Sequence, residues 1–313
     1  MPFSSNLESY TDKLYTHKAL NFFLDLNEAD LSDTSIRDLE PALKIALHDM
    51  QDLENGAIAN PDENRPVGHY WLRNHSLAPT AEITKQIEDT INSIKSFATA
   101  VHHGRLLTPH GTVFSHILLI GIGGSALGPQ FIADALDPKT SMTIHFLDNT
   151  DPDGIDRILS DLSEELSETL VIVISKSGGT AETRNGMLET QEVFTNRGLD
   201  FSRQAVAITG QDSQLYKLAS EDNWLSIFPM WDWVGGRTSV MSAVGLLPAA
   251  LLGIDIDALL AGASTMDEIT RSGDISDNPA ALLAQAWFIL GEGKGSKDMV
   301  VLPYKDRLLL FSR

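Results

Sequence analysis

Cysteine is absent from the 313 residues, which excludes disulfide bonds, thiolate zinc sites and cysteine nucleophiles. This absence is compatible with the cytoplasm, which is the location that we expect. Basic residues are also scarce, since 23 lysines and arginines stand against 43 aspartates and glutamates, for a formal net charge of −20. Because nucleic acids bind clusters of positive charge, we expect no nucleic-acid partner.

Long hydrophobic segments are missing too. The longest apolar run extends from Ala243 to Ile254, whereas a membrane-spanning helix needs about 18 or more apolar residues. We therefore expect a buried helix in this run and no membrane partner. The first residues lack the basic region and apolar stretch of a signal peptide. The sequence has no G-x-S-x-G or Walker pattern, and the pair His102 and His103 matches no metal-binding spacing. Hydrolase and nucleotidase functions are accordingly disfavoured.

The sequence pattern of residues 1–110 predicts a helical N-terminal region. From Ile83 to Phe97, apolar residues recur at intervals of four and three, which is the spacing of one amphipathic helix. Between the helices lies a segment rich in proline and asparagine, NPDENRPVGHYWLR at 60–73, which interrupts any helix.

Residues 111–255 alternate between short apolar runs and segments of helical length. Apolar strands that alternate with helices predict a parallel sheet covered on both faces, and thus a doubly wound α/β domain. The four expected strands are HILLIGIG at 116–123, MTIHFLD at 142–148, TLVIVIS at 169–175 and AVAITG at 205–210. Ligands of such sheets bind outside the carboxyl ends of the strands. We therefore look for chemistry in the loops that start near Gly121, Asp148, Ser175 and Gly210.

Residues 256–313 predict linker helices and the beginning of a second α/β domain. A helix is expected over residues 280–290 and a strand over 299–304, MVVLPY. The final segment starts like a helix and has no cap or polar tail. We therefore expect the chain to be the front part of a longer protein.

A glycine-rich segment, GIGGSALG at 121–128, joins the first strand to a helix. Glycine lets the backbone approach a ligand closely, and the N–H groups that begin a helix attract anions. The same letters fit the dinucleotide pattern G-x-G-x-x-A, with Asp148 near the place of a ribose-binding acid, so a dehydrogenase is a competing interpretation. A tight packing turn without any ligand is a third.

A second loop, SKSGGT at 175–180, favours a phosphate over a dinucleotide. It brings three hydroxyl groups and a lysine, from Ser175, Lys176, Ser177 and Thr180, to another strand end. Two neighbouring loops of this kind can donate several hydrogen bonds to one phosphate. The alternative is that Ser175 and Thr180 only cap the next helix. We interpret Glu182 as a residue that complements the dipole of that helix.

Arg237 is the candidate for stabilising negative charge. In WDWVGGRTSV, two glycines precede this arginine, and we expect it at the start of an apolar helix. A guanidinium there suits a developing oxyanion. The alternative is an ion pair with Asp232. Trp231 and Trp233 are expected in the core.

With these segments in order, the sequence resembles the phosphoglucose isomerase family, whose members contain two sugar-isomerase (SIS) domains with a flavodoxin-like fold. The resemblance rests on NPDENRPVGHYWLR, IGIGGSALGP, WDWVGGRTSVMSAVGL and VLPYKDRLLLFSR, and it runs through most of the chain. One loop departs from the family, which commonly reads S-K-T-F-T-T-x-E-T where this chain has SKSGGTAET. Gly179 therefore stands in place of a hydroxyl residue.

The resemblance implies cofactor-free isomerisation of glucose 6-phosphate to fructose 6-phosphate through an enediolate. It implies sugar contacts from Gly124 and Ser125 and a stabilising role for Arg237. It also implies a 6-phosphate site made by four residues of the second loop, Ser175, Lys176, Ser177 and Thr180. The family's base glutamate and ring-opening histidine match no residue here, so we expect the chain alone to be inactive.

The family is typically dimeric, and we expect a homodimer for the full-length protein. The main alternative is a non-catalytic SIS module that senses sugar phosphates. The arginine segment favours an enzyme, because a sensor needs no oxyanion stabiliser.

Overall fold

The computed structural model describes residues 13–29, 31–136, 138–140 and 142–312. Its centre is a five-stranded parallel sheet in the order β6-β5-β7-β8-β9. The strands are β5 (His116–Ile120), β6 (Thr143–Leu147), β7 (Thr169–Ser175), β8 (Ala205–Thr209) and β9 (Ser226–Pro229). The predicted fold class and all four predicted strands are confirmed, whereas β9 was missed. The sequence of this strand is SIFP, with only two apolar residues before the final proline, so its hydrophobic pattern is too short to indicate a strand.

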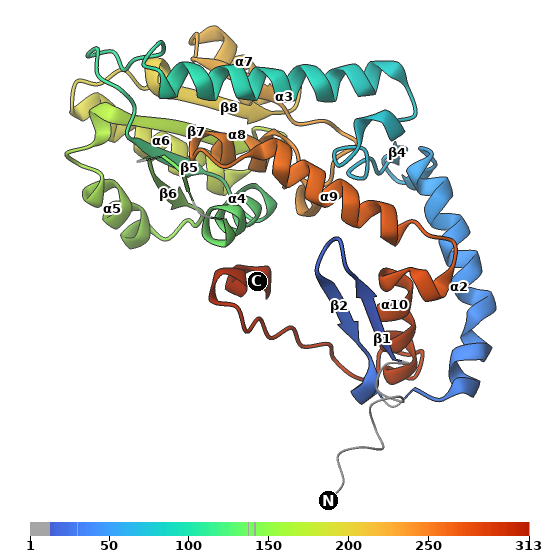
Figure 1. The fold of residues 1–313 in the computed structure, drawn as a ribbon. Coiled ribbons are helices and arrows are strands. Elements are labelled where there is room, and N and C mark those ends of the chain that lie inside the picture. Colours follow the sequence, from blue (N-terminus) through green and yellow to red (C-terminus); the bar gives the residue numbers. More distant parts are fainter. Residues whose placement is uncertain (1–12, 30, 137, 141, 313) are drawn as a thin grey trace, which may run out of the picture.

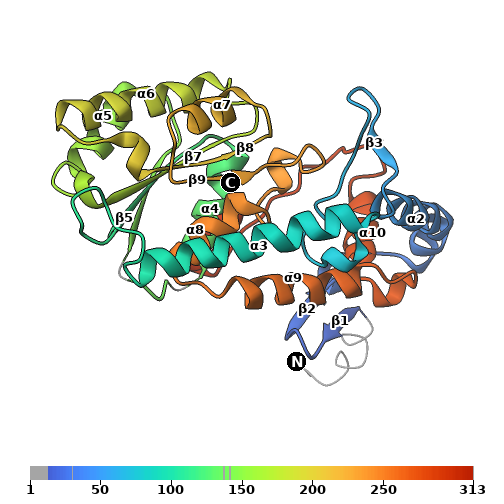
Figure 2. The ribbon, with the colours of Figure 1, turned by 90° about the horizontal axis from the view of Figure 1, so that it is seen from above.

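Helices cover both faces of the sheet, as Figure 2 shows. Successive residues of a strand point to opposite faces, and in β7 all seven are buried. Ile172 packs with α3 (Ala81–His102), α4 (Gly124–Ala135) and α8 (Ala243–Leu251), while Val173 packs with α5 (Pro152–Asp161), α6 (Ala181–Asn196) and α7 (Gln214–Glu221). These two cores explain why the strands are continuous apolar runs.

The N-terminal region contains two long helices, α2 (Asp33–Glu54) and α3. The predicted amphipathic helix is confirmed in α3, where Ile87 and Ile94 are buried and the Thr80 hydroxyl accepts a hydrogen bond from the backbone N–H of Ile83. Two antiparallel hairpins were not expected: β1 (Leu14–His17) with β2 (Phe22–Asp25), and β3 (Ile58–Asn60) with β4 (Arg65–Pro66). Their strands are too short to give a clear alternating pattern.

The C-terminal part begins with α9 (Ile256–Thr270) and α10 (Pro279–Leu290), the second of which the sequence predicted. The predicted strand at 299–304 is wrong. These residues are irregular, and Val300 is 72% and Tyr304 97% exposed. An apolar run forms a strand only where another strand pairs with its backbone, and the described residues offer no such neighbour. The chain then forms η7 (Asp306–Ser312), near the C-terminal end marked in Figure 1. It lies against α4, where the rings of Phe131 and Phe311 are in contact.

The described residues also form short 3-10 helices: η1 (Asn27–Ala29), η2 (His75–Leu77), η3 (Leu166–Glu168), η4 (Phe201–Gln204), η5 (Gly236–Thr238) and η6 (Ile275–Asp277). Within the described residues, no helix is both long and apolar enough to cross a membrane. Residues 1–12, which include most of the segment examined for a signal peptide, lie outside the described part. The domain boundaries at 110 and 255 stay predictions.

A buried ionic cluster joins α9 to the segment before α3. Arg73 Nη1 donates to Asp267 Oδ1 at 2.7 Å, and Arg271 Nη2 lies 2.9 Å from Glu54 Oε2. The Asp267 side chain is only 3% exposed. Burial raises the pKa of the neighbouring Glu54 carboxyl, and the positive charge of Arg271 opposes that shift. The cluster thus depends on each buried carboxylate keeping its arginine.

We expect Arg73→Met to lower the free energy of unfolding by about 3 kcal/mol, because it removes the closest partner of a buried carboxylate. The matched change Lys95→Met breaks an ion pair with Asp257 whose side chains are 39% and 66% exposed. It should cost less than about 1 kcal/mol. Urea denaturation of both variants measures the difference, and equal losses would contradict the structural role of the buried cluster.

Candidate functional site

The candidate site lies where the strand order reverses. From β5 the chain crosses to β6 on one side of the sheet, whereas β7 pairs with β5 on the other side. A crevice for ligands forms at such a reversal, outside the carboxyl ends of the two central strands. The loop after β5 begins at Gly121 and the loop after β7 follows Ser175. The topology therefore places the two predicted phosphate loops side by side.

The loop after β5 depends on glycine for its conformation and its packing. Gly123 precedes α4 with φ of +58°, a conformation that residues with a Cβ rarely adopt. A Cβ on Gly124 would lie 2.0 Å from the carbonyl oxygen of Gly236. The loop that carries Gly124 and Ser125 is thus in backbone contact with the turn that carries Arg237.

The loop after β7 is organised by its own hydroxyl groups. The buried Ser175 Oγ accepts a hydrogen bond from the N–H of Gly178 at 3.1 Å and donates to Thr180 Oγ1 at 3.4 Å. Ser177 Oγ accepts from the N–H of Gly179 at 3.1 Å. Thr180 occupies the N-cap position of α6, but its side chain makes no capping hydrogen bond. Capping by Thr180 therefore does not account for this loop.

The Lys176 side chain reaches the turn after β9. Its Nζ donates to the carbonyl oxygens of Asp232 at 3.0 Å and Val234 at 3.1 Å, and it lies 3.7 Å from Asp232 Oδ1. Burial lowers the pKa of the Lys176 ammonium, whereas the charge of Asp232 opposes this shift. No local sequence pattern indicated these contacts.

Arg237 lies in η5 and not at the start of the apolar helix, so that expectation is wrong. The helix α8 begins only at Ala243, after a further turn. The expected alternative, an ion pair with Asp232, is also absent among the described residues, because Asp232 pairs with Lys176 and Arg65 instead, each at 3.7 Å. The Arg237 side chain is exposed beside the glycine loop.

Trp231 and Trp233, expected in the core, stack on each other with ring centroids 4.8 Å apart. Both are partly buried and pack against a small apolar cluster that contains Trp71 and Val234. The turn before Arg237 is therefore packed against the protein through these two rings.

A cavity of about 680 Å³ adjoins the loop after β7. Lys176 and Ser177 line it together with the loop after β8, and α3 forms another wall. A smaller cavity of about 90 Å³ beside Ser175 is lined by Thr183, whose hydroxyl is buried without a partner among the described residues. The sequence did not predict this hydroxyl in the cavity, because a threonine within a helix carries no local signal of its surroundings.

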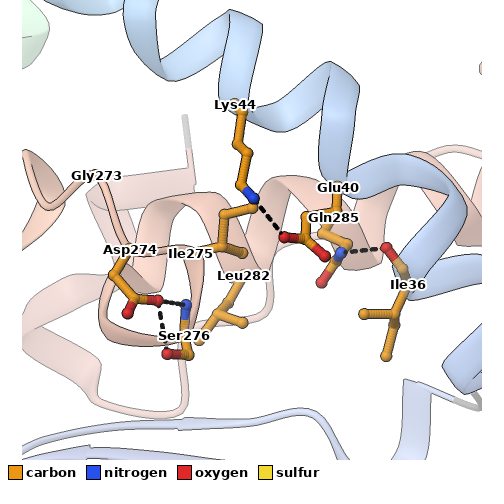
Figure 3. A pocket seen from close by; sticks show the side chains of 9 residues that line it. All are labelled: Ile36, Glu40, Lys44, Gly273, Asp274, Ile275, Ser276, Leu282 and Gln285. Carbon is orange, nitrogen blue, oxygen red and sulfur yellow. Dashed lines mark hydrogen bonds and ion pairs between the residues drawn. The ribbon is translucent and has the colours of Figure 1, made fainter.

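Another cavity, of about 570 Å³, lies far from the sheet between α2, η6 and α10 (Figure 3). Its polar groups contact one another: Lys44 pairs with Glu40, Ser276 donates to Asp274, and Gln285 donates to the carbonyl of Ile36. These paired groups leave little to recognise a ligand. Across the described residues, no group of three or more histidines, aspartates or glutamates could hold a metal ion.

We expect Gly124→Ala to destabilise the protein by about 1–3 kcal/mol, because the new Cβ would collide with backbone that cannot move freely. The matched variant Gly236→Ala places its Cβ in open space, with no atom within 4 Å. It should change the free energy of unfolding by less than about 0.5 kcal/mol. Denaturant titration compares the two, and a tolerated Gly124→Ala would show that the two loops are not in firm contact.

Comparisons with known proteins identify the family of the chain. A sequence model of the phosphoglucose isomerase family matches residues 29–313. A glucose-6-phosphate isomerase of Synechococcus elongatus is 58% identical over 307 residues, which cover 98% of this chain and 58% of that protein. One from Citrifermentans bemidjiense is 56% identical over the same shares.

A crystal structure of a glucose-6-phosphate isomerase from Chlamydia trachomatis has a TM-score of 0.84 and 25% sequence identity, and the match covers 98% of this chain and 60% of that chain. The chain spans 58% of the length of the curated relatives named above. It belongs to the phosphoglucose isomerase family.

Proposed function

We propose that this chain provides the substrate phosphate site and the enediolate-stabilising arginine of a glucose-6-phosphate isomerase. The observation that carries the proposal is that two small-residue loops follow the adjacent strands β5 and β7, at the point where the strand order reverses. Family membership supports the reaction class, since the relatives at 56–58% identity bear this name. The reaction interconverts glucose 6-phosphate and fructose 6-phosphate without a cofactor.

The proposed phosphate site uses neutral donors. Ser175, Ser177 and Thr180 supply hydroxyl groups, and α6 begins at the next residue with its N-terminus towards the loop. Such donors satisfy several phosphate oxygens, and the helix dipole favours negative charge there. Gly124 and Ser125, at the N-terminus of α4, would contact the sugar. An anion can thus bind locally on a protein whose formal net charge is −20.

Arg237 would act on the carbon end of the substrate. Isomerisation moves a proton between C1 and C2, and negative charge then develops on the oxygens of the enediolate. A guanidinium carries a permanent charge and two parallel donors, so it can stabilise both oxygens without changing its own protonation state. The position of Arg237 next to Gly124 supports this role, because the sugar would lie between the loop after β5 and the loop after β7.

The base and the ring-opening group are assigned to no residue of this chain. Glu182 keeps its interpretation as an acid in the first turn of α6. A full catalytic cycle therefore needs groups that the chain does not supply. The homodimer and the cytoplasmic location stay predictions.

Binding of fructose 6-phosphate should stabilise the chain, whereas NAD should not. A ligand that binds only the folded state adds RT ln(1 + [L]/Kd), which is about 2.7 kcal/mol at a hundredfold excess over Kd. Thermal shift measurements with each compound make the comparison, with inorganic phosphate as a reference. A rise in Tm with NAD and none with the sugar phosphate would favour the dehydrogenase interpretation instead.

In an active isomerase that contains this chain, Arg237→Ala should lower kcat and kcat/KM together by about 10²–10³-fold. Arg237→Lys should recover only part of the loss, because lysine keeps the charge but not the planar fork. Steady-state kinetics and Tm are measured on the same preparations. Normal folding with near-normal kcat in Arg237→Ala would refute the catalytic assignment.

A further inference from the structure

The ammonium group of Lys176 contacts the turn after β9 through two hydrogen bonds and one ion pair. An ammonium has three N–H donors, and three acceptors surround this one: the carbonyl oxygens of Asp232 and Val234, and the Asp232 carboxylate. The side chain is only 28% exposed. A partly buried ammonium is stabilised by such partners, because removing it from water without them is costly. Its donors are thus directed to the turn.

The same turn is held at its middle carbonyl as well. The oxygen of Trp233 accepts a hydrogen bond from the N–H of Gly68 at 2.8 Å. A Cβ on Gly68 would lie 2.6 Å from Trp233 Cε3, so the two segments are packed closely. Three successive carbonyl groups, from residues 232 to 234, are therefore fixed immediately before the glycines that lead to Arg237.

The main chain of Lys176 makes a third connection. Its carbonyl oxygen accepts a hydrogen bond from the N–H of Gly210 at 3.0 Å, in the loop after β8. Lys176 thus links the ends of β7, β8 and β9 through one residue. The turn it holds leads to Gly236, whose carbonyl lies against Gly124 in the loop after β5. A continuous set of contacts therefore runs from the phosphate loop to the arginine.

We propose that Lys176 is a positioning residue, whose ammonium clamps the carbonyl groups of Asp232 and Val234 and so fixes Arg237 beside the phosphate loop. In this role the ammonium does not bind the phosphate, which is held by hydroxyl and N–H groups. The inference rests on the proposed function for its ligand, but the clamp itself is a property of the fold. The lysine of this loop thereby connects phosphate binding to the position of the arginine.

The test compares Lys176→Met with Lys217→Met, which removes an exposed lysine from α7. Hydrogen exchange followed by mass spectrometry reads the backbone amides of residues 233–238 in the chain itself. We expect exchange there to become at least about tenfold faster in Lys176→Met and to stay unchanged in Lys217→Met, because loss of the two carbonyl contacts lets the turn open locally.

Calorimetric titration with two probes separates positioning from direct binding. In Lys176→Met, Kd for both inorganic phosphate and fructose 6-phosphate should stay within about twofold, because the proposed interaction of Arg237 with the substrate is made mainly in the transition state. A lysine that bound the phosphate directly would weaken both probes by the same factor, about 10–150-fold, since charge-assisted hydrogen bonds have that strength. That result, with unchanged exchange at 233–238, would overturn the proposal.

Two further outcomes are informative. If the unsubstituted chain binds neither probe, the proposed function fails, while hydrogen exchange still decides whether Lys176 clamps the turn. If Lys176→Met does not fold, Lys176→Gln gives the same comparison with the charge removed and a shorter side chain that keeps an amide NH2 group. Lys176→Arg should restore most of the protection at 233–238, because a guanidinium can donate to two carbonyl groups. If amide exchange at 233–238 is unchanged in both Lys176→Met and Lys176→Gln, the proposed clamp is rejected.

Discussion

The close backbone contact between Gly124 and Gly236 is the constraint on which the candidate site depends. No side chain separates the loop after β5 from the turn after β9 at this point, and a single methyl group on Gly124 would force them apart. The contact brings the N-terminus of α4 next to Arg237, although β5 and β9 are not neighbours in the sheet. Glycine is used here for space, whereas at Gly123 it is used for a positive φ.

The sheet was predictable because its strands are buried on both faces. All seven residues of β7 and all five of β8 are buried, and this requirement produces continuous apolar runs that can be read directly from the sequence. The misses occurred where burial is partial. The edge strand β9 is short, and the segment 299–304 is apolar but has no pairing partner in the described chain. Composition alone does not distinguish an unpaired apolar segment from a strand.

The site was predictable in its parts and not in its arrangement. The glycine and hydroxyl residues of the two loops are marked by unusual composition at strand ends, which local reasoning detects. The direction of the Lys176 side chain depends instead on a turn more than fifty residues later in the chain, at Asp232 and Val234. The position of Arg237 depends likewise on contacts with Gly124. Such long-range contacts leave no trace in local sequence patterns.

Electrostatics explains why the proposed site would use neutral donors for the phosphate and an arginine for the enediolate. In the proposed site a phosphate brings its own negative charge, so neutral hydroxyl and N–H donors at the N-terminus of α6 would be sufficient to hold it. Enediolate charge develops only during the reaction, and a permanently charged guanidinium in a fixed place favours that state over the ground state. Fixing an arginine on an exposed turn requires an anchor. We propose Lys176 as that anchor because its ammonium donates to carbonyl groups of the turn, and in the proposed arrangement the guanidinium then faces the substrate.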